Sequence, residues 1–248
     1  MTNRNAEASP LFYARIAGAG LLLMAVLAMF SNGAVLGGLI VPGDAAATAA
    51  NVSANEMLFR SGLIGFIVVL ILDVLVAWAL YEALKPAHPQ LAALAAAFRL
   101  VYTAIFGAAL YHLANVLQLL GGDGAMKGFT TEQVQAQAML SIDSFNNGWL
   151  IGLVFFGLHL LVVGSVIAKC RGVLPRPIGI VLIVAAAGYV IDSFAHVLLP
   201  DYADYKTIFL LMVAVPGIVG ELSLAFWLLM KGVKAPKAPA IRTNDFPS

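Results

Sequence analysis

Charged side chains are scarce in this chain of 248 residues, at 11% against about 25% in an ordinary soluble domain. The fourteen basic and thirteen acidic residues nearly balance, which leaves a formal net charge of +1. So small a charge gives no overall field to attract nucleic acid, and we expect no such partner. Cysteine is scarcer still, since Cys170 stands alone. One cysteine excludes an internal disulfide framework and a zinc cluster built from cysteines.

Apolar residues take the place of the missing charge. They make up 61% of the chain, and the mean hydropathy is +0.93. A bilayer core about 30 Å thick needs roughly 20 apolar helical residues per crossing. Six runs meet that length: 11–41, 61–84, 91–120, 149–168, 178–199 and 208–230. Because hydrocarbon offers backbone groups no water, the sequence predicts an all-α polytopic transmembrane helix bundle.

The domain organisation is simple. We expect a single transmembrane helical domain over residues 1–234 and a disordered tail over 235–248, where three prolines and mixed charge stand in a short polar segment. The first apolar run is too long for a cleaved signal peptide, and we expect it to be retained.

Basic residues predict the orientation. Ten of them fall on one set of connections and ends: Arg4, Arg15, Lys85, Lys169, Arg171, Arg176, Lys231, Lys234, Lys237 and Arg242. The opposite loops carry only Arg60, Lys127 and Lys206. The positive-inside rule then places both termini in the cytoplasm, in a multi-pass protein of the inner membrane.

Two outer connections are long enough to hold structure. Asp44 can cap a short helix over residues 45–56, and Thr130 with Gln133 can form a capping box in the stretch 123–147. We interpret both as helices lying along the outer interface, with a lid over an outer-facing cavity as the alternative. Within the spans, Gly33 with Gly37 and Gly148 with Gly152 have the spacing of small residues that lets helices approach closely.

Four ionisable residues are predicted at a common depth in the membrane. Asp73, Arg99, His159 and Glu221 come from the second, third, fourth and sixth runs, at about 12–16 Å from the cytoplasmic end. An unpaired charge there costs about 2.5–3.5 kcal/mol or more. Arg99 is therefore predicted to pair with Asp73 or with Glu221. The acid left over is protonated, bonded to His159 or neutralised by a cationic ligand.

This layer has two interpretations. The first is a static ion pair that orients the helices, and the second is a ligand site or proton relay. The surplus acid is the reason for keeping the second.

An outer layer of polar residues lies at about 21–30 Å. Its members are His112, Asp143, Asn147, Asp192 and His196. Asp192 and His196 are four residues apart and share one helix face. With His112 as a third ligand they could hold zinc or iron, and the alternative is a hydrogen-bonded polar cluster or ligand pocket.

Several segments carry a family resemblance. They are Leu39-Ile-Val-Pro-Gly-Asp-Ala-Ala-Ala-Thr-Ala-Ala-Asn51, Phe98-Arg99-Leu100, Leu150-Ile-Gly-Leu-Val-Phe-Phe-Gly-Leu-His159, Leu174-Pro175-Arg176, Gly188-Tyr189-Val190-Ile191-Asp192, Gly220-Glu221-Leu222, and Trp227 with Lys231-Gly232. Together they resemble an uncharacterised family of bacterial membrane proteins, domain of unknown function 4386. The resemblance implies a bundle of six or seven helices and no particular reaction. Arg99, His159, Asp192 and Glu221 coincide with these motifs, whereas His112 and His196 lie outside them.

Three functions remain open. Our first expectation is a protein that holds a small amphipathic or lipid-like ligand in a polar-lined cavity within the membrane, with proton-coupled transport as an extension. The second is a metal-dependent lipid hydrolase inside the membrane, with Asp192, His196 and His112 as candidate ligands. The third is an accessory subunit of a larger membrane complex. The partners are then membrane lipid, the ligand or that complex; the sequence names no cofactor and does not decide whether the protein is an enzyme.

Overall fold

The computed structural model describes residues 9–121, 128–170 and 173–233. All regular structure in these residues is helical, and six helices are long and apolar enough to cross a membrane. The predicted all-α bundle with six spans is thereby confirmed, and the chain is a multi-pass membrane protein. The tail predicted over residues 235–248 lies outside the described residues.

The spans begin and end close to the predicted residues. The first consists of α1 (Pro10–Ala28), a π-helical segment η1 (Met29–Leu36) and the short α2 (Gly37–Leu39). The others are α4 (Glu56–Leu84), α5 (Pro89–Leu120), α6 (Thr131–Lys169), α7 (Arg176–Leu198) and α8 (Tyr202–Met230).

The fourth span differs most from its prediction. Thr130 and Gln133 form the expected capping box, in which the Thr130 hydroxyl accepts from the backbone of Gln133. The helix that starts there is not a separate interfacial helix, because it continues without a break to Lys169. No proline interrupts residues 131–169. At 1.5 Å per residue, a helix of 39 residues is about twice as long as the hydrocarbon core is thick.

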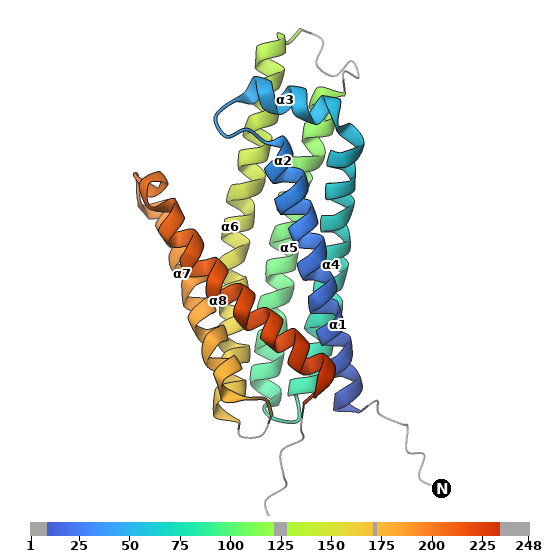
Figure 1. Ribbon diagram of the computed structural model, residues 1–248, viewed down its shortest axis with the longest axis vertical. Helices are drawn as coiled ribbons and strands as arrows, with labels where there is room; N and C mark the ends of the chain where they lie inside the picture. Colours follow the sequence, from blue (N-terminus) through green and yellow to red (C-terminus); the bar gives the residue numbers. More distant parts are fainter. Residues whose placement is uncertain (1–8, 122–127, 171–172, 234–248) are drawn as a thin grey trace, which may run out of the picture.

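The other outer helix is present, and it ends at Ala54 rather than at residue 56. α3 (Ala45–Ala54) begins at Asp44, whose carboxylate accepts a 2.8 Å hydrogen bond from the backbone N–H of Ala47. Two side chains of α3 fasten it to the end of the first span. Thr48 Oγ1 accepts from the Val41 N–H at 2.9 Å, and Asn51 donates to the Leu39 carbonyl at 3.1 Å. α3 also packs across α6 (Figure 1).

The six spans pack in a ring that is closed at one end. Around the ring, α1 packs on α4, α4 on α5, α5 on α6, α6 on α7, and α7 on α8, and α8 packs on α1. Figure 1 shows α8 crossing the bundle obliquely, from a free tip on one side to the base of α1. It meets α1 near Gly18, where a Cβ would lie 2.7 Å from the Ala225 carbonyl oxygen. Toward its tip, α8 diverges from the upright helices (Figure 1).

Small residues bring neighbouring helices together in the rest of the ring. A Cβ on Gly148 would lie 2.9 Å from the Ala109 side chain, so this glycine packs as predicted. Gly164 and Gly179 face each other so closely that a Cβ on either would lie within 2.7 Å of the other's carbonyl oxygen. Gly33 differs, because no heavy atom lies within 4 Å of its Cβ position. Its predicted role in packing is not seen within the described part of the chain.

Aromatic rings fill the core of the outer half. Phe66, Phe106, Phe145 and Trp149 pack on one another with ring centroids 5.3–6.1 Å apart. From Phe106 the contacts continue inward through Tyr102 and Phe156 to Tyr189. Such offset and edge-on ring pairs add about 0.5–1.5 kcal/mol each beyond simple burial. The column leads from the outer core to the layer of ionisable residues.

Candidate functional site

An ion pair between Arg99 and Asp73 lies at the centre of the bundle. Arg99 Nη2 of α5 is 2.7 Å from Asp73 Oδ1 of α4. Both residues are fully enclosed, with 1% and 0% of their surface exposed. A guanidinium buried this deeply requires a carboxylate at its own depth, and the nearer of the two candidate acids supplies it. Of the two predicted pairings, the structure contains Arg99 with Asp73.

His159 of α6 contacts the ion pair, and we call Asp73, Arg99 and His159 together the clasp. Its Nε2 lies 3.2 Å from Arg99 Nη1, and its Nδ1 lies 2.8 Å from the Ala95 carbonyl oxygen. A guanidinium can only donate and a carbonyl can only accept, so Nε2 accepts and Nδ1 carries the proton. This tautomer is neutral and satisfies both ring nitrogens. His159 is therefore held as a fixed acceptor for Arg99, and the clasp joins three helices.

Weaker contacts surround the guanidinium. Arg99 Nη2 points at the sulfur of Met24 in α1 at 3.7 Å, and the guanidinium carbon lies 5.6 Å from the centre of the Phe156 ring. Within the described residues, Arg99 Nε and both oxygens of Asp73 have no well-directed hydrogen bond. Asp73 and Arg99 thus attract each other through charge more than through a directed bond.

Glu221 of α8 is the surplus acid. The Tyr189 hydroxyl of α7 donates to Glu221 Oε1 at 3.3 Å. Within the described residues, no basic side chain lies within 4.0 Å of this carboxyl, and His159 is committed to Arg99 instead. Arg99 and Asp73 still lie near enough for their charges to act on Glu221. Unlike the members of the clasp, Glu221 is only half-buried.

The backbone of α8 is locally weakened just before Glu221. Pro216 stands inside this helix and removes a backbone donor, which weakens the helix at that point. The next residue, Gly217, makes room for the tyrosine, because a Cβ there would lie 3.1 Å from the Tyr189 hydroxyl. A methyl group at position 217 would therefore require the Tyr189 hydroxyl to shift by a few tenths of an ångström.

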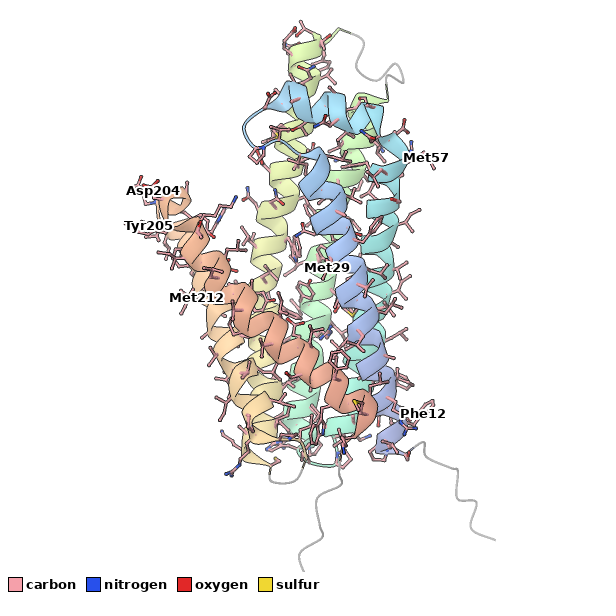
Figure 2. All side chains as sticks on the ribbon, in the orientation of Figure 1. Phe12, Met29, Met57, Asp204, Tyr205 and Met212 are labelled. Carbon is pink, nitrogen blue, oxygen red and sulfur yellow. The ribbon has the colours of Figure 1, made fainter. Side chains whose placement is uncertain are left out.

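The outer polar residues do not form a single cluster. Asp143 and Asn147 are exposed on α6, and His112 of α5 packs against the neighbouring Tyr111 ring. Asp192 and His196 of α7 both contact Tyr202, which none of the sequence arguments had singled out as a partner. The Tyr202 hydroxyl donates to Asp192 at 2.6 Å, and its ring centre lies 4.4 Å from that of His196. Figure 2 shows Asp204 and Tyr205 at the same free tip of α8.

No hydrogen bond joins any two of the five predicted outer residues in the part of the chain that the structure describes. Nor does that part contain a group of three or more His, Cys, Asp or Glu side chains placed to hold a metal ion. Asp192, His196 and His112 stay candidates by type and depth, but their positions provide no set of ligands.

Tyr189 is the member of the site that sequence reasoning missed. A signal was available, because Tyr189 lies in the middle of its span and far from the interfaces where membrane tyrosines gather. A phenol buried there needs a hydrogen-bond partner. In the predicted run 208–230 of the next helix the one carboxyl is Glu221, and the pair could have been predicted from that.

Comparison with known proteins places the chain in a family. The sequence profile of the family described as domain of unknown function (DUF4386) matches residues 16–232. A relative from Archaeoglobus fulgidus, an uncharacterized protein, is 29% identical over 172 residues, which cover 69% of this chain and 84% of the relative. No solved structure matches. The matched region runs through all six spans and includes Arg99, Asp73, His159 and Glu221, and the chain belongs to the DUF4386 family.

Proposed function

We propose that this protein binds a small amphipathic ligand inside the membrane, with a cationic head group received by Glu221. One observation carries the proposal: Glu221 is a half-buried acid without a basic partner among the described residues, beside a clasp in which Arg99 is already neutralised by Asp73. A carboxylate in hydrocarbon is stabilised by a proton or by a cation. A cationic head group supplies the charge that the protein itself does not.

The packing of α8 supports a lateral route to this acid. α8 packs on α7 near Gly188 and Gly220 and on α1 near Gly18, whereas the main contacts of η1 are with α4, α1 and α2. Figure 1 shows the outer half of α8 standing away from the first span, and Figure 2 places the exposed Met29 on that side of the first span. Glu221 is itself half-buried, and Ile218, one turn earlier on α8, is exposed, so an alkyl chain in lipid can approach the carboxyl from this face of α8.

We further propose that the protein lies in the inner membrane with both termini in the cytoplasm. Pro10 begins the first span and Met230 ends the last, and these two helix ends lie at the same end of the bundle (Figure 1). Most basic residues belong to that end. The positive-inside rule makes it the cytoplasmic end. Labelling with a membrane-impermeant maleimide tests this proposal. In intact cells, the native Cys170 should stay unlabelled and an Asp204→Cys variant in a Cys170→Ser background should be labelled. The reverse pattern would show that the orientation is wrong.

Ligands with matched chains test the binding proposal. The probes are dodecyltrimethylammonium, dodecanol and dodecanoate, added in equal amounts to the full-length protein in lipid nanodiscs, with native mass spectrometry as the readout. We expect the cationic probe to be retained preferentially. Glu221→Gln should weaken its binding about tenfold, which corresponds to about 1.4 kcal/mol. Glu82→Gln, a matched change near Lys85 at the end of α4, should leave binding unchanged. Equal retention of all three probes, or wild-type binding by Glu221→Gln, would contradict the proposal.

The hydrolase and the accessory subunit receive no such support. The described residues bring together no set of metal ligands, and no feature of the packing points to a particular protein partner.

A further inference from the structure

One face of α7 carries a series of polar side chains from its outer end to Glu221. Tyr189, Asp192, Ser193 and His196 are spaced as i, i+3, i+4 and i+7, so they lie along a single side of the helix. We define these four residues as the α7 polar stripe. Its inner end is the Tyr189 hydroxyl, which donates to Glu221 at 3.3 Å. Its outer end is the exposed His196, beside Tyr202.

Ser193 stands in the middle of the stripe and is unexplained by packing. The residue is 4% exposed, and its Oγ has no hydrogen-bond partner within the described structure. Burying a hydroxyl without a partner is unfavourable, so such a group usually binds water or another ligand. Ser193 is four residues from Tyr189 and three from His196, or about 6 Å and 4.5 Å along the axis. Because these are separations of backbone positions, a short chain of water molecules has to join the side-chain oxygens.

The opposite direction from Glu221 offers no comparable route along α7. Between Gly179 and Gly188 this helix contains only glycine, alanine, valine, leucine and isoleucine. At the same end of the bundle α8 is closed against α1, where Gly18 packs on Ala225 and Leu229. Polar access to Glu221 along α7 therefore runs toward the outer end of the bundle.

We propose that Glu221 takes up and releases its proton through the α7 polar stripe, toward the outer side. This inference concerns the site of the proposed function and rests on the same acid. A proton enters as hydronium at Asp192 and His196, passes along water held by Ser193 to the Tyr189 hydroxyl, and Tyr189 transfers its own proton to the Glu221 carboxylate. Each oxygen gives one proton and gains one, so the stripe returns to its initial state. The consequence is that binding of a cation at Glu221 releases a proton to the outer side.

The groups around Glu221 leave it as the proton acceptor of the site. From α7 it faces Tyr189, and Arg99 and the buried Tyr102 of α5 and Asp73 of α4 lie near enough to interact with it electrostatically. Asp73 is occupied by Arg99, and α6 contributes His159, which is bonded to Arg99 and Ala95. The ionisable residues of the described part of α1, Tyr13 and Arg15, lie near the cytoplasmic end of that helix.

Infrared spectroscopy of hydrogen–deuterium exchange tests the route. The full-length protein without added ligand is transferred rapidly from H₂O to D₂O, and the carboxylic acid C=O band of Glu221 is identified by its loss in Glu221→Gln. We expect Ser193→Ala to slow deuteration of this band at least tenfold. Ser193→Thr, which retains a hydroxyl, should exchange at nearly the wild-type rate. Ser165→Ala on α6 is the matched control and should have no effect.

Two results would overturn the inference. Exchange at the wild-type rate in Ser193→Ala would show that protons reach Glu221 by another path. Absence of a Glu221 C=O band in the wild-type protein would show that this acid holds no proton to exchange. Neither depends on the alkylammonium measurements, so failure of the route and failure of the ligand proposal can be told apart. A size-exclusion profile and helical circular dichroism confirm that each variant is folded.

Discussion

The Arg99–Asp73 pair affects both the stability of the folded protein and the charge at the centre of the bundle. Arg99 is bound by Asp73 and His159 on two other helices, with almost no exposed surface. Replacing a buried ion pair by apolar groups is often neutral, but removing one member leaves the other charged and unpaired. Removing only one member of the pair is therefore expected to destabilise the folded protein strongly.

We expect Asp73→Asn to destabilise the folded protein by about 3–5 kcal/mol, because it leaves the guanidinium without a counter-charge. The double variant Asp73→Leu with Arg99→Met should lose less unfolding free energy than Asp73→Leu alone or Arg99→Met alone. Titration with sodium dodecyl sulfate, followed by circular dichroism, measures the unfolding free energy. A double variant whose loss equals the sum of the two single losses would show that the residues do not interact.

Sequence reasoning reached the residues of this site but not their partners. Depth can be counted along a helix, so Asp73, Arg99, His159 and Glu221 could be placed in one layer from the sequence. Rotation about the helix axis and contact between helices cannot be counted in the same way. For that reason the pairing of Arg99 with Asp73 stayed open, and the bond from Tyr189 to Glu221 was missed.

At the scale of elements, glycine decides where helices can touch. Gly217 gives the Tyr189 hydroxyl its place beside Glu221, while Gly164 and Gly179 bring α6 and α7 into backbone contact. Gly38 has no heavy atom within 4 Å of its Cβ position. It therefore supplies a matched control for substitutions at the other glycines.

We expect Gly217→Ala to weaken binding of dodecyltrimethylammonium about threefold, less than Glu221→Gln, because the added methyl would lie 3.1 Å from the Tyr189 hydroxyl and lengthen its hydrogen bond to Glu221. Native mass spectrometry measures the retained probe. Gly38→Ala should bind as the wild type does. If Gly217→Ala binds equally well, Tyr189 does not position the carboxyl.

Gly164→Ala should act on stability instead. Its methyl would lie 2.6 Å from the Gly179 carbonyl oxygen, so α6 and α7 must separate. Overpacking of this kind costs about 1–3 kcal/mol. The unfolding free energy in sodium dodecyl sulfate measures the loss, and a Gly164→Ala protein as stable as Gly38→Ala would contradict the packing described above.

Element boundaries were predictable where a chemical signal marks them. Asp44 and Thr130 cap helices as their sequence context indicates. The outer extension of α6 was mistaken for a separate helix because its polar composition was interpreted as an interface. Asn147-Gly148 is also a common turn signal, yet the helix continues through it, where Gly148 packs on Ala109 and no proline intervenes. The π-helical segment Met29–Leu36 carries no sequence signal of this kind.

For the whole molecule, the number of spans follows from hydropathy alone, since apolar runs of sufficient length must cross as helices. The closing of the ring by α8 against α1 does not follow, because it depends on the crossing near Gly18 and Ala225 between the first and last spans. This closure lies one helical turn from Glu221, since Ala225 follows it by four residues on α8.

The most direct test of the central claim is native mass spectrometry of the full-length protein, extracted with its own membrane lipids and without added probe. Our account predicts an additional mass on the wild-type protein and on Glu82→Gln that fragments as a cationic amphipath and is absent from Glu221→Gln. A bare chain in all three proteins, or the same adduct retained by Glu221→Gln, would contradict it.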